Sequence, residues 1–282
     1  MFGLICSVAG AAELPAQGQA PAPPPQAVAP AECASETTVG RGIDISRSAG
    51  EPTVQDFENI KQQGYRFVIV NGWGGVTRNS HARVQLSRAK TAGLLTAGYC
   101  YLNFASSMDG ASQVREALAA FGREAAHLGF FAIDVETSAR SQLSQGLRLE
   151  PPDVSAQQQA LARITEAVQQ LEEFNLRTVI YTKKCDWQRI TGDTQQFKGL
   201  PLWNPRTIGG DELTQPDLAR SSDTFGGWSS RVGKQFELDT ILTDPPIQVD
   251  LNVFDLSAFS PRNPNFSLPP LDADVPTLVV KK

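Results

Sequence analysis

The sequence has few of the residues that build common metal and redox sites. It has four cysteines and two histidines in 282 residues. His81 and His127 both fall in stretches expected to be helical, so neither a histidine-based catalytic triad nor a histidine-rich metal site is expected. The cysteines form no C-x-x-C pair, which excludes a zinc or dithiol motif of that kind. They stand at Cys6, Cys33, Cys100 and Cys185. We therefore expect a protein that uses no metal and no cofactor.

The chain also lacks a basic excess and a long apolar run. Its net charge is −5 and its pI is about 5.2, which disfavours nucleic acid, since such a partner requires a basic face. After the first dozen residues no apolar run approaches the ~20 residues of a membrane-spanning helix. The composition, 41% hydrophobic and 20% charged, is that of a globular protein. A monomer without nucleic acid or a membrane span is expected.

The two ends differ in composition from the middle. Residues 1–12 form a short apolar run that ends in small residues, Ala9-Gly10-Ala11, and predict a signal peptide. Residues 13–38 are rich in Pro and Ala and predict an extended linker, and residues 261–282 form a Pro-rich tail. A catalytic domain is expected over 39–260, in a protein that is secreted or periplasmic.

Within that domain, strand-like and helix-like segments alternate. The first five predicted strands are Gly42–Ser46, Phe67–Asn71, Thr96–Asn103, Phe130–Glu136 and Thr178–Thr182. Helices are expected over Thr53–Gln63, Ser80–Thr91, Ala111–His127 and Ser155–Phe174. Three more strands follow with little helix between them: Pro201–Asn204, Gly233–Leu238 and Ile247–Leu251.

This pattern predicts an α/β fold with a single closed, parallel, TIM-like barrel of five βα units followed by three strands. The alternative is an open doubly wound sheet. Such a sheet usually carries a Gly-rich dinucleotide turn after its first strand, and Arg47-Ser48-Ala49-Gly50 is no such turn.

Four acidic residues follow or end predicted buried strands: Asp44, Asp134, Glu136 and Asp250. A buried carboxylate is costly unless it is satisfied or used, so their recurrence on three strands indicates a site. Asp134 and Glu136 are two residues apart and point the same way, roughly 6.6 Å apart along the strand. The first and eighth strands of a closed barrel are neighbours, which brings Asp44 beside Asp250.

Clustered carboxylates repel one another, so at least one should hold its proton at unusually high pH. A protonated carboxylic acid beside ionised ones is what cleavage of a glycosidic bond requires. Six aromatic or polar residues near strand ends are candidates to line a sugar-binding groove: Trp73, Tyr99, Tyr101, Asn103, Tyr181 and Trp203. Magnesium or manganese is the other common use of grouped acids, but no strand end supplies the accompanying Lys or His apart from Lys183-Lys184.

Several motifs, in this order, resemble the glycoside hydrolase family 25 lysozymes, the Chalaropsis-type muramidases. The motifs are Gly-Ile-Asp-Ile-Ser (42–46), Gly-Tyr-Arg-Phe-Val-Ile-Val (64–70), Ala-Lys-Thr-Ala-Gly-Leu-Leu-Thr-Ala-Gly-Tyr-Cys-Tyr (89–101), Phe-Ala-Ile-Asp-Val-Glu (131–136), Val-Ile-Tyr-Thr (179–182), Pro-Leu-Trp (201–203) and Val-Asp-Leu-Asn-Val-Phe (249–254). The resemblance implies a barrel of the kind described and hydrolysis of the β-1,4 bond between N-acetylmuramic acid and N-acetylglucosamine in peptidoglycan.

The resemblance also assigns roles. Glu136 would be the proton donor, Asp134 would stabilise the reacting centre or orient the acetamido group, and Asp44 and Asp250 would complete the acidic floor. The chain departs from the family at Asn71-Gly72-Trp73, where Arg is frequent, and at Cys100, where His is common. These departures leave two alternatives open, a non-catalytic glycan-binding relative and a hydrolase of another amino-sugar polymer.

Overall fold

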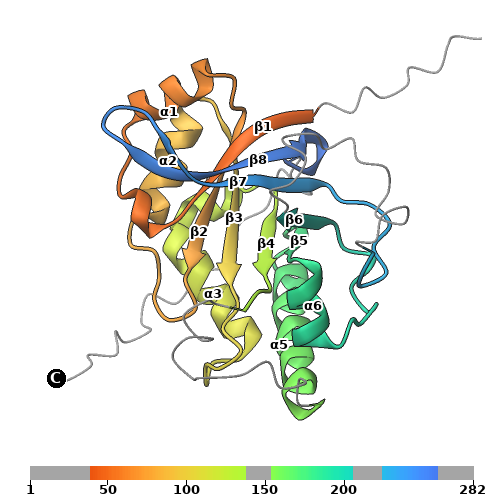
Figure 1. The fold of residues 1–282 in the computed structure, drawn as a ribbon. Helices are drawn as coiled ribbons and strands as arrows, with labels where there is room; N and C mark the ends of the chain where they lie inside the picture. The colour runs from red at the N-terminus through yellow and green to blue at the C-terminus, as the bar shows by residue number, and fades with distance from the viewer. Residues whose placement is uncertain (1–38, 138–153, 206–223, 260–282) are drawn as a thin grey trace, which may run out of the picture. The chain divides into compact units, whose positions relative to one another are not determined.

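The computed structural model describes residues 39–137, 154–205 and 224–259, and within them eight strands close a barrel in chain order (Figure 1). The strands are β1 (Val39–Ile45), β2 (Phe67–Trp73), β3 (Leu95–Tyr101), β4 (Phe131–Asp134), β5 (Thr178–Tyr181), β6 (Leu202–Pro205), β7 (Gly233–Leu242) and β8 (Ile247–Asp255). The expected α/β barrel is therefore confirmed. The predicted signal peptide, linker and tail lie outside the described residues and stay predictions.

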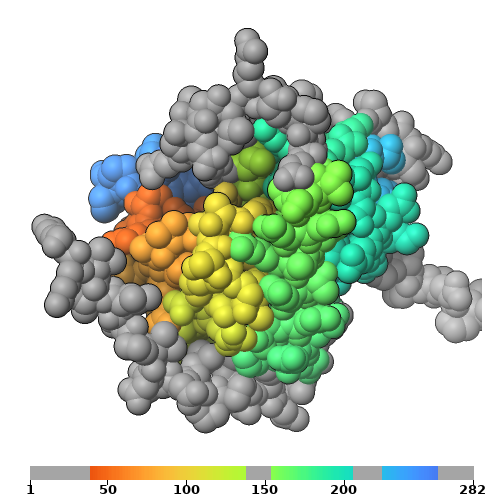
Figure 2. Space-filling model, turned by 90° about the horizontal axis from the view of Figure 1, so that it is seen from below, coloured from red at the N-terminus to blue at the C-terminus, as the bar shows by residue number. Residues whose placement is uncertain are grey.

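Five helices of the described part follow the first five strands in turn and lie outside the barrel. They are α1 (Val54–Gln62), α2 (Ala82–Thr91), α3 (Gly110–Phe121), α5 (Val154–Glu173) and α6 (Lys184–Thr191). Neighbours in this order are in contact, and Figure 2 shows them as a continuous arc from orange through yellow and green to cyan. The five βα units are thus confirmed. No helix among the described residues is both long and apolar enough to cross a bilayer.

The local sequence explains where these helices begin and end. Thr53 caps α1: its side chain accepts from the Asp56 N–H, and the Asp56 carboxylate accepts from the Thr53 N–H, which is a capping box. The single helix predicted over Ala111–His127 is wrong. Helix α3 ends at Phe121 because Gly122 has a positive φ of 55°, and a 3-10 helix (Gly122–His127) continues from there.

The eighth strand corrects the prediction of an all-parallel barrel. Strand β8 is antiparallel to both of its neighbours, β7 and β1. Only a four-residue turn separates β7 from β8, and so short a connection cannot carry the chain back for a parallel pairing. As a result Asp250 lies in the first half of β8, not near its end, and it is paired directly with Asp44 of β1.

The core has two layers, divided by the alternation of side chains along each strand. On β2, Phe67 and Ile69 point into the barrel, whereas Val68 and Val70 pack against the helices. Aromatic rings fill one end of the barrel interior, and the backbone of β1 packs closely against them at Gly42. A Cβ at Gly42 would lie 2.2 Å from the Phe67 ring. The aromatic floor closes one end of the barrel interior, so polar side chains gather at the other.

Candidate active site

The four predicted acids line one cavity of about 90 Å³ at the carboxyl ends of the parallel strands. Asp44 comes from β1, and Asp134 ends β4 with Glu136 two residues beyond it. Asp250 joins them because the reversed direction of β8 brings its first half to this end of the barrel. The complete lining is Asp44, Tyr99, Asp134, Glu136, Tyr181, Trp203, Gln235 and Asp250. Strands distant in sequence therefore converge on a single acidic cavity, as predicted.

Asp44 and Asp134 are the most deeply buried of these acids, with exposed fractions of 6% and 5%. Burial, with the charges of Asp250 and Glu136, raises the pKa of Asp44 to about 8, against the lowering effect of hydrogen bonds from Asn252 and Gln235. Burial and the nearby Glu136 and Asp44 likewise raise the pKa of Asp134 well above its usual value. The cavity therefore holds protons at a pH where exposed carboxyls have lost them.

One oxygen of Asp134 has no hydrogen-bond partner among the described residues. Its Oδ1 is fully buried and unpaired. A buried carboxylate oxygen without a partner is costly, and this cost agrees with the raised pKa of Asp134, which favours the protonated form.

Glu136 and Asp250 are less deeply buried, and each has its own set of charged neighbours. Burial raises the pKa of Glu136; the Lys183 ammonium opposes that rise, while Asp186 and Asp250 add to it. Burial also raises the pKa of Asp250, against the lowering effect of the Asp239 N–H, which donates to Asp250 Oδ1 at 2.8 Å. A carboxyl that keeps its proton therefore lies beside carboxylates that have lost theirs. General acid catalysis requires this arrangement.

Lys183 and the first turn of α6 border Glu136. Lys183 Nζ lies 3.2 Å from Asp186 Oδ2, and Thr137 Oγ1 donates to Asp186 Oδ1 at 2.6 Å. Asp186, which is 4% exposed, thereby ties the residue after Glu136 to α6. The sequence prediction did not assign Lys183 or Asp186 a role in the site, although Lys183 follows the end of the fifth strand.

Two carboxamide side chains contact the acids of the cavity, and the sequence prediction missed both. Gln235 of β7 is 3% exposed and Asn252 of β8 is fully buried. Gln235 Nε2 donates to Asp44 Oδ2 at 2.8 Å and to Asp250 Oδ2 at 3.2 Å. Asn252 Nδ2 donates to the same Asp44 oxygen at 2.7 Å. Asn252 was accessible to prediction, because it is two residues from Asp250 on the same face of a strand.

Tyr99, Tyr181 and Trp203 line the cavity, as predicted. The Trp203 ring packs edge-on against both tyrosines, with centroid distances of 4.5 Å to Tyr181 and 6.3 Å to Tyr99. These rings form a wall between the acids and the apolar floor.

The other three residues expected to line a sugar-binding groove, Trp73, Tyr101 and Asn103, are not in the lining of this cavity. A β-bulge in β2 shifts the pairing from Asn71–Tyr99 to Trp73–Cys100, so Trp73 turns outward and its indole Nε1 donates to Gln113 of α3. Tyr101 ends β3 and its hydroxyl lies 3.4 Å from the Glu136 carbonyl. Asn103 lies beyond the strand and donates to the Gly75 carbonyl. Neither Tyr101 nor Asn103 is among the residues that line the acidic cavity.

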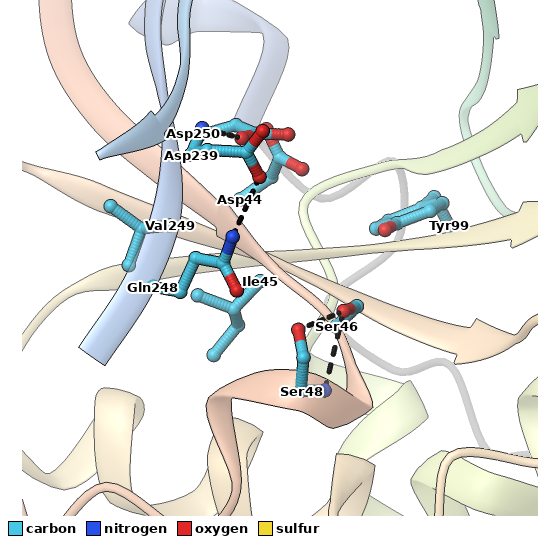
Figure 3. A pocket seen from close by; sticks show the side chains of 9 residues that line it. All are labelled: Asp44, Ile45, Ser46, Ser48, Tyr99, Asp239, Gln248, Val249 and Asp250. Atoms are coloured by element: carbon cyan, nitrogen blue, oxygen red, sulfur yellow. Dashed lines mark hydrogen bonds between the residues drawn. The ribbon is translucent and has the colours of Figure 1, made fainter. Parts of the chain in front are cut away.

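A second cavity of about 110 Å³ adjoins the first and shares Asp44, Tyr99 and Asp250 with it (Figure 3). Its remaining lining is polar except for Ile45 and Val249: the Ser46 and Ser48 hydroxyls lie 2.9 Å apart, and Gln248 donates to Asp239 at 2.7 Å. The acidic cavity therefore continues along the paired strands β1 and β8. Among the described residues, no group of three or more His, Cys, Asp or Glu side chains is placed to hold a metal ion.

Comparison with known families identifies the barrel. The family model described as Lysozyme-like protein 1 matches residues 35–236. The chain belongs to this lysozyme-like family. Its matched segment begins just before β1 and ends within β7, so it includes Asp44, Asp134 and Glu136 but stops short of Asp250.

Relatives of the lysozyme-like chain point the same way. It is 27% identical over 222 residues to "Probable GH family 25 lysozyme 3" of Dictyostelium discoideum, a match that covers 78% of this chain and 42% of the relative. It is 26% identical over 200 residues to "Lysozyme-like protein 3" of Caenorhabditis elegans, with 69% and 61% covered. The chain thus spans about half the length of the curated relatives that it matches.

Among solved structures, a family GH25 lysozyme from Aspergillus fumigatus shares the fold. The TM-score is 0.58 at 21% identity, and the match covers 77% of this chain and 94% of that one. Together these comparisons confirm the resemblance to glycoside hydrolase family 25 that the motifs indicated.

Proposed function

We propose that the lysozyme-like barrel is a glycoside hydrolase that cleaves the β-1,4 bond between N-acetylmuramic acid and N-acetylglucosamine in peptidoglycan. The observation that carries this proposal is the single cavity lined by Asp44, Asp134, Glu136 and Asp250. Membership of the family and the resemblance of the motifs supply the substrate class. Action on a wall polymer fits a secreted or periplasmic protein, and that location is part of the proposal.

Glu136 is the proton donor in this proposal. It is the less buried member of the Asp134–Glu136 pair, and its raised pKa keeps a proton available for the leaving oxygen. Asp134 stabilises the positive charge that develops at the sugar carbon, or orients the acetamido group of the substrate. Asp250 extends the negative field around that centre, and Asp44 completes the acidic lining of the cavity.

The position of Cys100 argues that the replacement of the family's common His does not inactivate the site. Cys100 is fully buried, and its Sγ faces the carbonyl of Gln113 of α3 at 3.7 Å. The exchange of the family's common His for Cys therefore lies on the helix side of β3 and does not reach the acidic cavity.

The decisive experiment is digestion of purified peptidoglycan, followed by mass spectrometry of the products and an assay of new reducing ends. Muropeptides that end in N-acetylmuramic acid support the proposal. Saccharide binding without products after long incubation would show a glycan-binding relative, and products from another amino-sugar polymer alone would show a different hydrolase.

Glu136→Gln tests the assigned role. The amide keeps the shape of the side chain but has no proton to donate, so we expect turnover to fall by at least about a hundredfold with thermal unfolding close to that of the parent. Glu172→Gln, on the exposed face of α5, removes the same charge outside the site and should retain full activity. Substantial turnover by Glu136→Gln would remove this residue from its role.

A further inference from the structure

Two aromatic residues in the wall of the acidic cavity are sealed from solvent. Trp203 is 1% exposed and Tyr181 is 9% exposed. A sugar ring stacks on an accessible aromatic face, and neither ring offers one. Each instead uses its polar atom: Tyr181 Oη donates to Gln235 Oε1 at 2.8 Å, and Trp203 Nε1 donates to Asn252 Oδ1 at 2.9 Å.

These two hydrogen bonds decide which way the carboxamides point. An indole N–H is only a donor, so the oxygen of Asn252 must face Trp203. Burial and the surrounding carboxylates raise the pKa of Tyr181 well above its usual value, so the phenol keeps its proton and donates to the oxygen of Gln235. With both oxygens engaged, both NH2 groups must point away from the aromatic wall.

The two NH2 groups converge on one oxygen. Gln235 Nε2 and Asn252 Nδ2 lie 2.8 and 2.7 Å from Asp44 Oδ2. We propose that Tyr181 and Trp203 are positioning residues: acting through Gln235 and Asn252, they fix the Asp44 carboxyl in one orientation, with Oδ2 as the permanent acceptor. The proposal assigns them a role other than sugar contact, and its effect on turnover rests on the proposed hydrolase function.

A chemical consequence follows for Asp44. A proton on Oδ2 would face two N–H donors, so any proton that Asp44 carries is held on Oδ1. Its pKa of about 8 means that such a proton is present at neutral pH. The orienting bonds thus fix the location of one proton in the cavity, which a freely rotating carboxyl would leave undefined.

Asp44 titrates among several charged or ionisable groups. They are Asp250 on β8, Asp134 and Glu136 at the end of β4, Tyr99 on β3 and Tyr181 on β5. The charges of Asp250 and Glu136 raise the pKa of Asp44, and the two carboxamides oppose this rise. Loss of either amide donor therefore raises the pKa of Asp44.

A double-mutant cycle on turnover distinguishes positioning from sugar contact. Tyr181→Phe keeps the ring but frees the Gln235 amide to turn its oxygen toward Asp44, and Gln235→Leu removes the amide. Each should lower kcat by about tenfold, the effect of losing one hydrogen bond that orients Asp44, with little change in KM. Because Tyr181 acts through Gln235, the double variant should be no slower than Gln235→Leu alone. Additive losses, or a raised KM for Tyr181→Phe, would overturn the proposal.

Titration of Asp44 by carbon-13 NMR gives a readout independent of catalysis. The apparent pKa of its carboxyl should be higher in Tyr181→Phe than in the parent, whereas Tyr65→Phe, outside the cavity, should leave it unchanged. If Gln235→Leu does not fold, the milder Tyr181→Phe variant still decides. An unchanged or lowered pKa contradicts the positioning role even if the parent digests peptidoglycan. A raised pKa supports it even if the parent digests nothing, so failure of the proposed function and failure of this inference are distinguishable.

Discussion

At the scale of single residues, Lys183 is a cation whose charge acts on both members of the Asp134–Glu136 pair. It lowers the pKa of each carboxyl, against the rise caused by burial. Burial lowers its own pKa, but Asp186, Cys185 and Glu136 together raise it by more, so the ammonium stays charged. Lys183 therefore tunes the pH range over which Glu136 holds its proton.

The variant Lys183→Met tests this tuning. Without the ammonium, the pKa of Glu136 rises, because the negative charges of Asp186 and Asp250 then act on it unopposed. A proton donor works only below its pKa, so the limb of the kcat–pH profile where activity falls with rising pH should move to higher pH. Lys198→Met, at an exposed position, removes the same charge and should leave the limb in place. A limb that stays or moves down in Lys183→Met would refute the assignment.

The acids were predictable from sequence because each lies within a buried strand or just after its end, where a carboxylate needs a reason to be present. Trp73 points away from the cavity for a reason that the sequence does not show: one extra residue in a bulge inverts the face to which every later side chain points. Gln235 carries no local signal. Its role depends on the register between β7 and β8, which brings it opposite Asn252.

At the scale of elements, a close approach between α3 and α5 holds part of the helical layer in place. Gly110 begins α3, and a Cβ built there would lie 1.9 Å from the carbonyl oxygen of Arg163 in α5. The Gly110 N–H also donates to the Glu166 carboxylate at 2.9 Å. The start of α3 therefore packs on the α5 backbone, at a distance that only glycine permits.

Gly110→Ala sets two effects against each other. Alanine favours a helix by at most about 1 kcal/mol, whereas a clash with backbone forces the helices apart and costs roughly 1–3 kcal/mol. The clash should win, and the midpoint of urea unfolding should fall. Gly199→Ala is the matched control, because no atom lies within 4 Å of its Cβ, and it should unfold like the parent. An unchanged midpoint for Gly110→Ala would show that the layer is loosely packed.

The direction of β8 followed from the spacing of the predicted strands, although we expected a parallel barrel. The predicted ranges left only residues 239–246 between the last two strands, which is too short for the crossover of a parallel pair and requires a hairpin. The closing Asp-Leu-Asn segment lies at the site only because this hairpin reverses the last strand, so strand direction decides whether Asp250 meets Asp44.

At the scale of the whole molecule, closing the barrel forces like charges together, and stability must then depend on pH. The pKa of Asp44 is about 8 in the folded protein, against about 4 for an aspartate in an unfolded chain. Between these two values the folded state binds more protons than the unfolded state, so the free energy of unfolding falls as pH rises. Asp134, Glu136 and Asp250 are shifted in the same direction.

Carboxyls outside the cavity have the opposite effect but in a different pH range. Hydrogen bonds within the N-cap of α3, chiefly from Ser112, lower the pKa of Asp109; at Glu124 burial opposes the fall, but bonding to Lys90 outweighs it. The stability that these two contribute is present above pH ~4 and is lost only below it. The melting temperature should therefore be highest in mildly acidic solution, near pH ~5, and should fall steadily toward pH ~8.

Asp44→Asn isolates the contribution of the cavity to this pH dependence. The amide mimics the protonated acid, with its oxygen in the place of Oδ2 facing the two carboxamide donors and its NH2 in the place of Oδ1. It carries no charge at any pH, so it removes repulsion with Asp250 and Glu136 that the parent gains as Asp44 ionises. Thermal unfolding across this pH range should show a shallower decline than in the parent and a higher melting temperature at pH 8. Parallel curves for the two proteins would mean that the proton on Asp44 is not linked to folding, and that the acids are less crowded than the closed barrel requires.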